Sequence, residues 1–255
     1  MSRRRWGRQL IPPLLSAAVL MLGSAAGIRA AYPASVDVNR TAFNPPCDGD
    51  ANPIVPKLQQ AAVAAYARLG HATTGYTGAA FTRAATLNRT PADWGYYVHS
   101  HGDFYWNPTD QRRYTGFRED SGDCAQSIVY SKDVKARRAG RQSNLVFIST
   151  CHSADGGTRA TTMPDAFAIA KVKAAGAINQ GPEFYVGYIG VRWDSDEWAF
   201  EQRFWNSLAA GRSVGASFDI AMGGAFNDPA FDADWWGTYG WSGVAGPWTV
   251  CKYCS

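Results

Sequence analysis

Cysteine and histidine, whose side chains act as nucleophiles, metal ligands or proton carriers near neutral pH, are scarce in this sequence. It contains five cysteines and four histidines among 255 residues, so a site built from thiols or imidazoles must use a very small set. Beyond residue 30 there is no apolar run long enough to cross a bilayer. There is also no internal repeat, low-complexity stretch or linker-like segment. These absences favour a single domain over residues 31–255.

The first 30 residues have the composition of a secretory signal peptide. Arginines at the start precede an apolar stretch from Leu10 to Gly27, and small residues suited to cleavage follow it. A retained membrane anchor is the alternative, but Pro12 and Pro13 and several Gly and Ala residues dilute a segment already near the minimum spanning length. We therefore expect a signal peptide over 1–30 and a secreted protein with no membrane association after its removal.

The net charge of +4 also depends on this leader. Five of the 25 basic residues lie in the first 30 positions, where there is no acidic residue, so the remainder carries 20 basic against 21 acidic residues. The rest of the chain is nearly neutral and has no basic stripe. This composition argues against a nucleic acid partner.

Export places the five cysteines in an oxidising compartment, where most cysteines pair. Because five is an odd number, at least one thiol is left over. The sequence does not decide the connectivity. We expect the four oxidised cysteines to be Cys47, Cys124, Cys251 and Cys254, and Cys151 to be free.

Strand-like and helix-like segments alternate along the chain. Strands are expected at 35–43, 73–81, 93–103, 144–151 and 183–193, helices at 52–70, 162–176, 194–211 and 213–226, and a short strand followed by a basic helix within 125–140. This alternation predicts an α/β fold with a mostly parallel sheet and helices on both faces. In such sheets, chemistry collects at the carboxyl ends of the strands.

Two predicted strands end in reactive side chains. "YYVHSHGD" ends on Ser100, His101 and Gly102, and "NLVFISTC" ends on Cys151. If these strands are parallel neighbours, the imidazole of His101 can activate the thiol of Cys151 for attack on a carbonyl. The backbone N–H groups of Gly102 and Cys151 can then face the developing oxyanion.

These motifs carry a family resemblance. A strand ending in His-Gly, followed 50 residues later by a strand ending in Cys, resembles the caspase–gingipain–separase group of cysteine peptidases. "ISTCHSA", in place of the caspase Gln-Ala-Cys, is more similar to the CHAT branch of that group. The downstream order of helix, Ala-Gly-Ala, strand, Trp-x-x-x-Asp-Glu, helix, Leu-Ala-Gly-x-Ser and helix is similar to CHAT as well. The resemblance covers roughly residues 93–225.

The resemblance implies a caspase-like three-layer sandwich and a cysteine endopeptidase with a His101–Cys151 dyad. It implies a protein or peptide substrate, no cofactor and no metal. It also places the pocket for the residue before the cut bond near Trp193 and Asp194, in the loop "VRWDSDEW". Acidic residues in this loop favour cleavage after Arg or Lys, although they can equally serve to cap the following helix.

Two other function classes remain open. "HSHGD" also spells His-x-His-x-Asp, which is similar to the metal-binding motif of the metallo-β-lactamase fold, but Phe104 replaces the histidine expected next and the strand–helix alternation does not fit. The Trp-rich C-terminal segment "DWWGTYGWSGVAGPW" instead suggests a non-catalytic binding protein on a caspase-like fold. Cys151 itself can also be a buried packing residue.

Overall fold

The structure is a computed structural model, and its described residues all belong to one unit, residues 31–255. The described ranges are 32–49, 52–140, 143–155, 161–167, 184–188, 190–191, 194–212, 214–225 and 236–240. The predicted leader and the cysteines at 251 and 254 lie outside them. Among the helices within these ranges, none combines the length and apolar character needed to cross a membrane.

Six strands form the main sheet, in the order β2-β1-β3-β7-β8-β9. Their bounds are β1 Tyr32–Val38, β2 His71–Tyr76, β3 Gly95–His99, β7 Leu145–Ser149, β8 Phe184–Tyr188 and β9 Trp236–Gly240. The first five in this order are parallel, and β9 pairs antiparallel with β8. The central strands β3, β7 and β8 are buried along their whole length, as expected of parallel strands covered on both faces.

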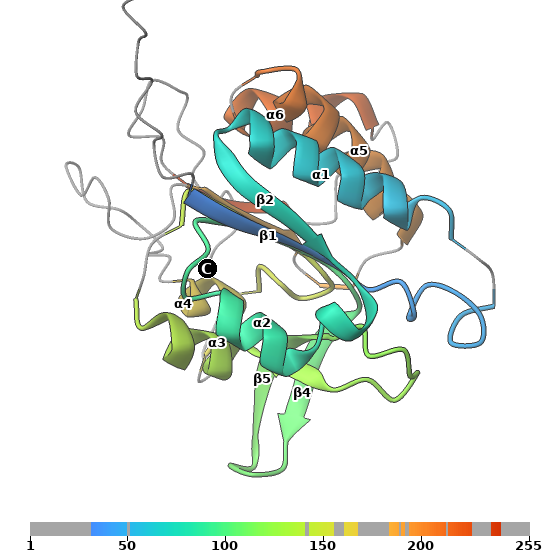
Figure 1. Ribbon diagram of the computed structural model, residues 1–255, viewed down its shortest axis with the longest axis vertical. Coiled ribbons are helices and arrows are strands. Elements are labelled where there is room, and N and C mark those ends of the chain that lie inside the picture. Colours follow the sequence, from blue (N-terminus) through green and yellow to red (C-terminus); the bar gives the residue numbers. More distant parts are fainter. Residues whose placement is uncertain are drawn as a thin grey trace, which may run out of the picture. The chain divides into compact units, whose positions relative to one another are not determined.

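Helices cover both faces of this sheet (Figure 1). One layer contains α1 (Val55–Arg68), α5 (Asp194–Ala209) and α6 (Val214–Ala225), and the other contains α2 (Arg83–Arg89), α3 (Ser131–Arg138) and α4 (Met163–Ala166). Each layer closes its own hydrophobic core: Trp205 and Phe147 belong to the first, and Tyr96 and Phe117 to the second. The predicted three-layer α/β sandwich is therefore observed.

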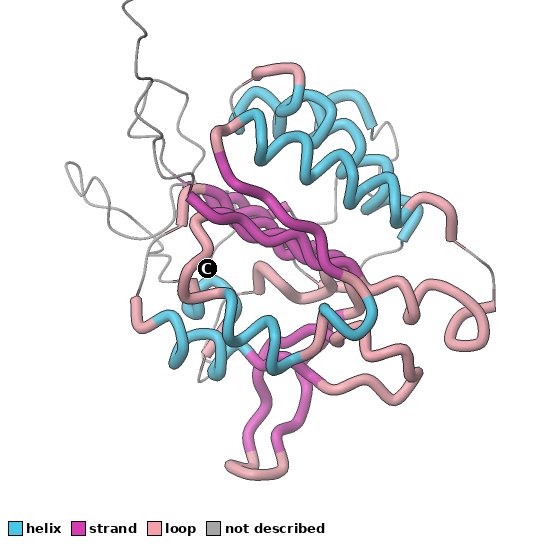
Figure 2. The backbone as a smooth tube through the Cα atoms, in the orientation of Figure 1, coloured by secondary structure: helices cyan, strands magenta, loops and turns pink. Residues whose placement is uncertain are grey.

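The predicted strand 93–103 is wrong at its end. β3 stops at His99, and a new strand, β4 (Gly102–Asn107), begins after Ser100 and His101. β4 pairs antiparallel with β5 (Arg112–Arg118), and β5 pairs with β6 (Ile128–Tyr130) to make a separate three-stranded sheet. Figure 2 shows the hairpin of β4 and β5 extending away from the main sheet. The chain thus changes sheets at His101.

The predicted helix 162–176 begins as expected. The hydroxyl of Thr162 accepts a hydrogen bond from the Asp165 N–H, and the Asp165 carboxylate accepts one from the Thr162 N–H, which is a capping box. The helix α4 nevertheless ends at Ala166, earlier than its apolar periodicity predicts. Residues 168–183 lie outside the described part of the chain.

A disulfide links Cys47, in the loop after β1, to Cys124, in the loop between β5 and β6. Among the cysteines in the described ranges, Cys151 is the one outside this disulfide. Both observations agree with the expected cysteine states.

Candidate functional site

The parallel register of β3 and β7 brings the two predicted strand ends together. His99 pairs with Ser149, and the Ser100 N–H donates a 3.2 Å hydrogen bond to the Ser149 carbonyl. His101 and Cys151 each follow this pair by two residues. They therefore leave the sheet from neighbouring strands at the same edge, the carboxyl edge of the parallel strands.

His101 is half-buried and is held through its backbone. Its carbonyl accepts a 3.0 Å hydrogen bond from the Arg118 N–H of β5. Its ring lies 4.5 Å, centroid to centroid, from Phe43, which also contacts His99 at 4.9 Å. The imidazoles of His99 and His101 therefore both pack against the ring of Phe43.

Ser100, the residue before His101, is held by a network of buried hydrogen bonds. The Ser100 hydroxyl donates a 2.7 Å hydrogen bond to the Arg118 carbonyl. It accepts a 3.1 Å bond from the Asn39 side chain, which also donates a 2.7 Å bond to Gln126. These bonds tie the turn at His101 to the two loops that the Cys47–Cys124 disulfide joins.

Gly102 lets this turn approach the chain at Cys151. A β-carbon placed on Gly102 would lie 2.5 Å from the side chain of Thr150 and 2.8 Å from the carbonyl oxygen of Cys151. Both distances are well inside van der Waals contact. The two strand ends are therefore packed against each other at a point where only glycine fits.

The N–H of Gly102 faces away from β5. In an antiparallel ladder, hydrogen-bonded and non-hydrogen-bonded residue pairs alternate. The bond from the Arg118 N–H to the His101 carbonyl marks one hydrogen-bonded pair, so the next pair, Gly102 with Phe117, is of the other kind. This orientation leaves the Gly102 N–H on the side of β4 opposite to β5.

The hairpin adds two residues near Cys151 that the sequence did not single out. Burial raises the pKa of the Tyr105 hydroxyl, the charges of Asp103 and Cys151 raise it further, and the Arg118 guanidinium lowers it. These influences place Tyr105 and Arg118 in the electrostatic surroundings of the thiol. β4 begins at Gly102, inside the strand predicted over 93–103, so the hairpin that carries Tyr105 and Arg118 is not predicted from the sequence.

His152 belongs to the loop after Cys151 and is engaged there. Its Nδ1 lies 2.7 Å from Asp155 and its Nε2 lies 4.0 Å from Asp103. The backbone N–H of His152 donates a 2.9 Å hydrogen bond to the Gly190 carbonyl, and the backbone N–H of Gly190 donates a 2.8 Å bond to the Asp155 carboxylate. These contacts anchor the loop after Cys151 to the segment that follows β8.

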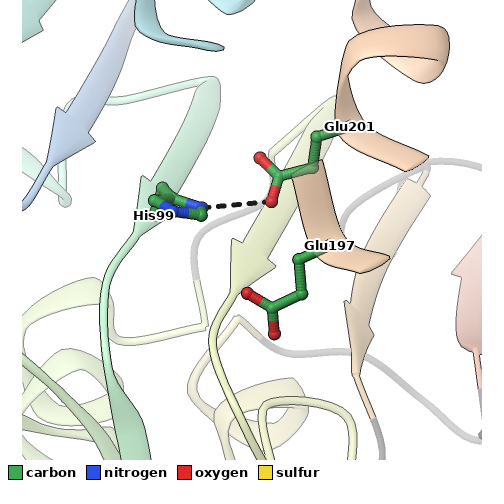
Figure 3. A group of neighbouring side chains, drawn as sticks. All are labelled: His99, Glu197 and Glu201. Carbon is green, nitrogen blue, oxygen red and sulfur yellow. Dashed lines mark hydrogen bonds and ion pairs between the residues drawn. The ribbon is translucent and has the colours of Figure 1, made fainter. Parts of the chain in front are cut away.

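A second polar group lies directly beneath this edge (Figure 3). The Nδ1 of His99 lies 3.1 Å from Glu201 Oε1 and 3.1 Å from the Ser149 hydroxyl. Glu201, on α5, also accepts hydrogen bonds from the hydroxyls of Ser149, Tyr97 and Tyr188. Burial, and next the charge of Glu201, hold the pKa values of Tyr97 and Tyr188 well above the ordinary value, so both remain donors.

His99, Glu197 and Glu201 place their ligand atoms within 4.8 Å of one another, and all three are buried. Nitrogen and carboxylate donors of this kind suit zinc. However, both ring nitrogens of His99 are already engaged, since the Trp198 indole N–H donates to Nε2 at 3.4 Å. We therefore describe the group as a hydrogen-bond network.

The alternative metal motif His-x-His-x-Asp is not assembled. Among the described residues, the His99–Glu197–Glu201 group is the one set of three possible ligands that lie close together, and it includes neither His101 nor Asp103. The reason is the turn at Ser100 and His101, which carries Asp103 onto the second sheet.

The predicted specificity loop is only partly described. Asp194 is the first residue of α5, and β8 ends six residues before it, at Tyr188. Trp193 and the side chain of Asp194 lie outside what the structure describes. From the Trp-rich segment, residues 236–240 form β9, whose backbone extends the main sheet.

No family model matches the sequence, and no curated protein does. Among solved structures, gingipain R, an Arg-specific cysteine proteinase, is similar over 81% of this chain with 10% sequence identity and a TM-score of 0.53. This chain spans about half of gingipain R, 46% of its length. A protein from Geobacter sulfurreducens is similar over 86% of this chain and 100% of its own, with 16% identity and a TM-score of 0.46.

At such low identity, the similarity to gingipain R shows the fold alone. It supports the caspase–gingipain fold predicted from the sequence, but it does not extend to the CHAT branch specifically. The chain therefore has a mixed α/β fold of caspase-like type.

Proposed function

We propose that this protein is a secreted cysteine endopeptidase that uses Cys151 as its nucleophile and His101 as the base. The observation that carries the proposal is the register of β3 and β7, since His101 and Cys151 each follow the His99–Ser149 pair by two residues. The caspase-like fold and the position of Cys151 outside the disulfide agree with this activity, and the disulfide between Cys47 and Cys124 agrees with export.

The proposed reaction begins with transfer of the Cys151 thiol proton to the imidazole of His101. The thiolate attacks the peptide carbonyl carbon, and the electron pair of the carbonyl moves to its oxygen. When the tetrahedral intermediate collapses, the C–N bond breaks and His101 gives its proton to the leaving amine. Water, deprotonated by His101, then hydrolyses the thioester and restores the thiol.

The negative oxygen of the intermediate needs donors placed in advance. We assign the N–H groups of Gly102 and Cys151 to this role. Its support is the orientation of the Gly102 N–H away from β5 and the close approach of Gly102 to the Cys151 backbone.

The proposed specificity is for Arg or Lys before the cut bond, with Trp193 and Asp194 contributing to the pocket. A carboxylate in a pocket pairs with a basic side chain and repels an acidic one. Asp194 stands at the start of α5, where it can cap the helix as well.

One labelling experiment tests the nucleophile. The purified protein without residues 1–30 is treated at pH 7 with iodoacetamide, and the labelled cysteine is located by peptide mass spectrometry. Cys151 should react at least tenfold faster than free cysteine, and the same treatment should abolish cleavage of a mixed peptide library. Reaction of Cys151 no faster than free cysteine, or cleavage that survives its complete alkylation, would refute the peptidase.

A further inference from the structure

Glu201 connects three adjacent strands from beneath the candidate site. It is fully buried, and it accepts hydrogen bonds from Tyr97 and His99 on β3, from Ser149 on β7 and from Tyr188 on β8. The order β3-β7-β8 makes these strands neighbours. One carboxylate on α5 therefore binds all three strands at the edge where His101 and Cys151 emerge.

The network also selects one tautomer of the His99 ring. An indole N–H can only donate, so the bond from Trp198 to Nε2 makes that nitrogen an acceptor. The ring proton then lies on Nδ1, from which it points to Glu201 Oε1 at 3.1 Å. Trp198 and Glu201 both lie on α5, so the helix holds the His99 ring from two sides.

The network around Glu201 lies next to the strand ends that carry His101 and Cys151. His99 and Ser149 are the last register pair of β3 and β7, and Phe43 packs on both His99 and His101. A shift of the His99 side chain would therefore displace His101, two residues further on, and a shift of Ser149 would displace Cys151 in the same way. Reacting groups must be held to within a fraction of an ångström for efficient attack.

We propose that Glu201 is a positioning residue that, through His99 and Ser149, sets the placement of His101 relative to Cys151. This inference rests on the proposed peptidase function. The substitution Glu201→Gln replaces one of the two carboxylate oxygens by an amide NH2 group, which donates instead of accepting, so at least one of the four buried donors loses its partner. The strand ends would then rearrange, and the reaction would slow without loss of substrate affinity.

The test compares Glu201→Gln and Tyr97→Phe with Tyr96→Phe as a matched control. Tyr96 and Tyr97 are neighbours on β3, both fully buried, and each donates a hydrogen bond to a buried carboxylate. Tyr96 belongs to the other hydrophobic core and donates to Asp37 at 2.9 Å. The two phenylalanine variants should therefore lose similar stability, while only Tyr97→Phe disturbs the network around Glu201.

Three readouts are measured for each variant: melting temperature, kcat and KM for a cleaved peptide, and the rate of Cys151 alkylation at pH 7. Glu201→Gln and Tyr97→Phe should lower kcat and the alkylation rate roughly tenfold, as expected for a disturbed buried hydrogen bond. Their KM should stay within about twofold of the wild-type value. Tyr96→Phe should keep both rates within about twofold of the wild type.

Wild-type kcat and alkylation rates in Glu201→Gln and Tyr97→Phe, beside a stability loss matching that of Tyr96→Phe, would overturn the proposal and leave a structural role only. Stoichiometric zinc in the wild type that disappears in Glu201→Gln would overturn it in favour of a metal centre. If Glu201→Gln does not fold, Tyr97→Phe decides alone. Failure of the proposed function gives a different result, because Cys151 of the wild type would then react no faster than free cysteine. In that case the positioning role of Glu201 would be refuted as well.

Discussion

Gly102 lies so close to Thr150 that a β-carbon at position 102 would be 2.5 Å from the Thr150 side chain. The Cys151 carbonyl oxygen lies 2.8 Å from the same point, and this backbone atom cannot move aside as a flexible side chain can. We predict that Gly102→Ala costs about 1–3 kcal/mol of unfolding free energy through overpacking. Peptidase activity should fall at least a hundredfold, because the strand ends carrying His101 and Cys151 are forced apart.

Chemical denaturation and peptide cleavage measure these two effects. Gly49→Ala is the control, since a β-carbon on Gly49 meets nothing within 4 Å. It should leave both quantities unchanged. Full activity in Gly102→Ala would show that the approach of the two strand ends does not matter for the reaction.

The two histidines near Cys151 should differ in their effect. His101→Ala should lower kcat by roughly 10²–10⁴, the usual contribution of a general base. His152→Ala should cost less than about tenfold, because His152 is engaged with Asp155 and holds the loop rather than the thiol. The cleavage rates of the two variants decide the assignment, and a larger loss in His152→Ala would make that residue the base.

The main sheet could be predicted because its strands carry a strong local signal. Short apolar runs such as Leu145–Ser149 alternate with helix-like segments, which predicts parallel strands between two helix layers, and this strand is buried along its whole length in the structure. The proposed dyad residues, His101 and Cys151, were selected by the same signal, since each stands just beyond such a run. The length of α4 was not predicted correctly: the apolar periodicity continues to residue 176, but the helix ends at Ala166.

The second sheet and the network of Glu201 could not be predicted in the same way. Strand β4 follows β3 after only Ser100 and His101, and no glycine or proline separates the two strands, so they look like one. Glu201 lies 102 residues from His99, and its surroundings read as an ordinary amphipathic helix. Glu201 meets its hydrogen-bond partners on β3, β7 and β8 only when α5 packs on the sheet.

The disulfide should make a large contribution to stability. Cys47 and Cys124 are 77 residues apart, and closing a loop of that size stabilises a folded protein by about 4.5 kcal/mol through the entropy of the unfolded chain. The double variant Cys47→Ser, Cys124→Ser should lose about this much in denaturant titrations. Alkylation of Cys151 in the native state should remain possible in the variant, and a loss below about 1 kcal/mol would contradict the prediction.

Asp93 should make stability depend on pH. Burial raises its pKa from 3.8 to about 6, so between these values the folded protein holds a proton that the unfolded chain has released. The resulting stabilisation is complete below pH 3.8 and is lost as the pH rises through about 6. Relative to the wild type, Asp93→Asn should therefore gain stability, on the order of 2 kcal/mol, between pH 4 and pH 7.5.

Denaturant titrations of both proteins at several pH values measure this difference. Asp110→Asn is the control, because the hydrogen bond from Lys132 lowers the pKa of Asp110 and its contribution must run in the opposite direction. A difference between Asp93→Asn and the wild type that stays constant with pH would show that Asp93 does not titrate in this range.

The pocket for the residue before the cut bond should contain the carboxylate of Asp194. A positional-scanning peptide library should show a preference for Arg or Lys before the cut bond, and Asp194→Asn should reduce kcat/KM for the best Arg substrate about tenfold. Asp103→Asn is the matched control, because the Asp103 carboxylate is 59% exposed on β4 beside the same edge. The control should keep the preference, since a solvated carboxylate discriminates little. A preference for Asp or a small apolar residue, or a larger effect of Asp103→Asn than of Asp194→Asn, would refute the assignment of Asp194 to the pocket.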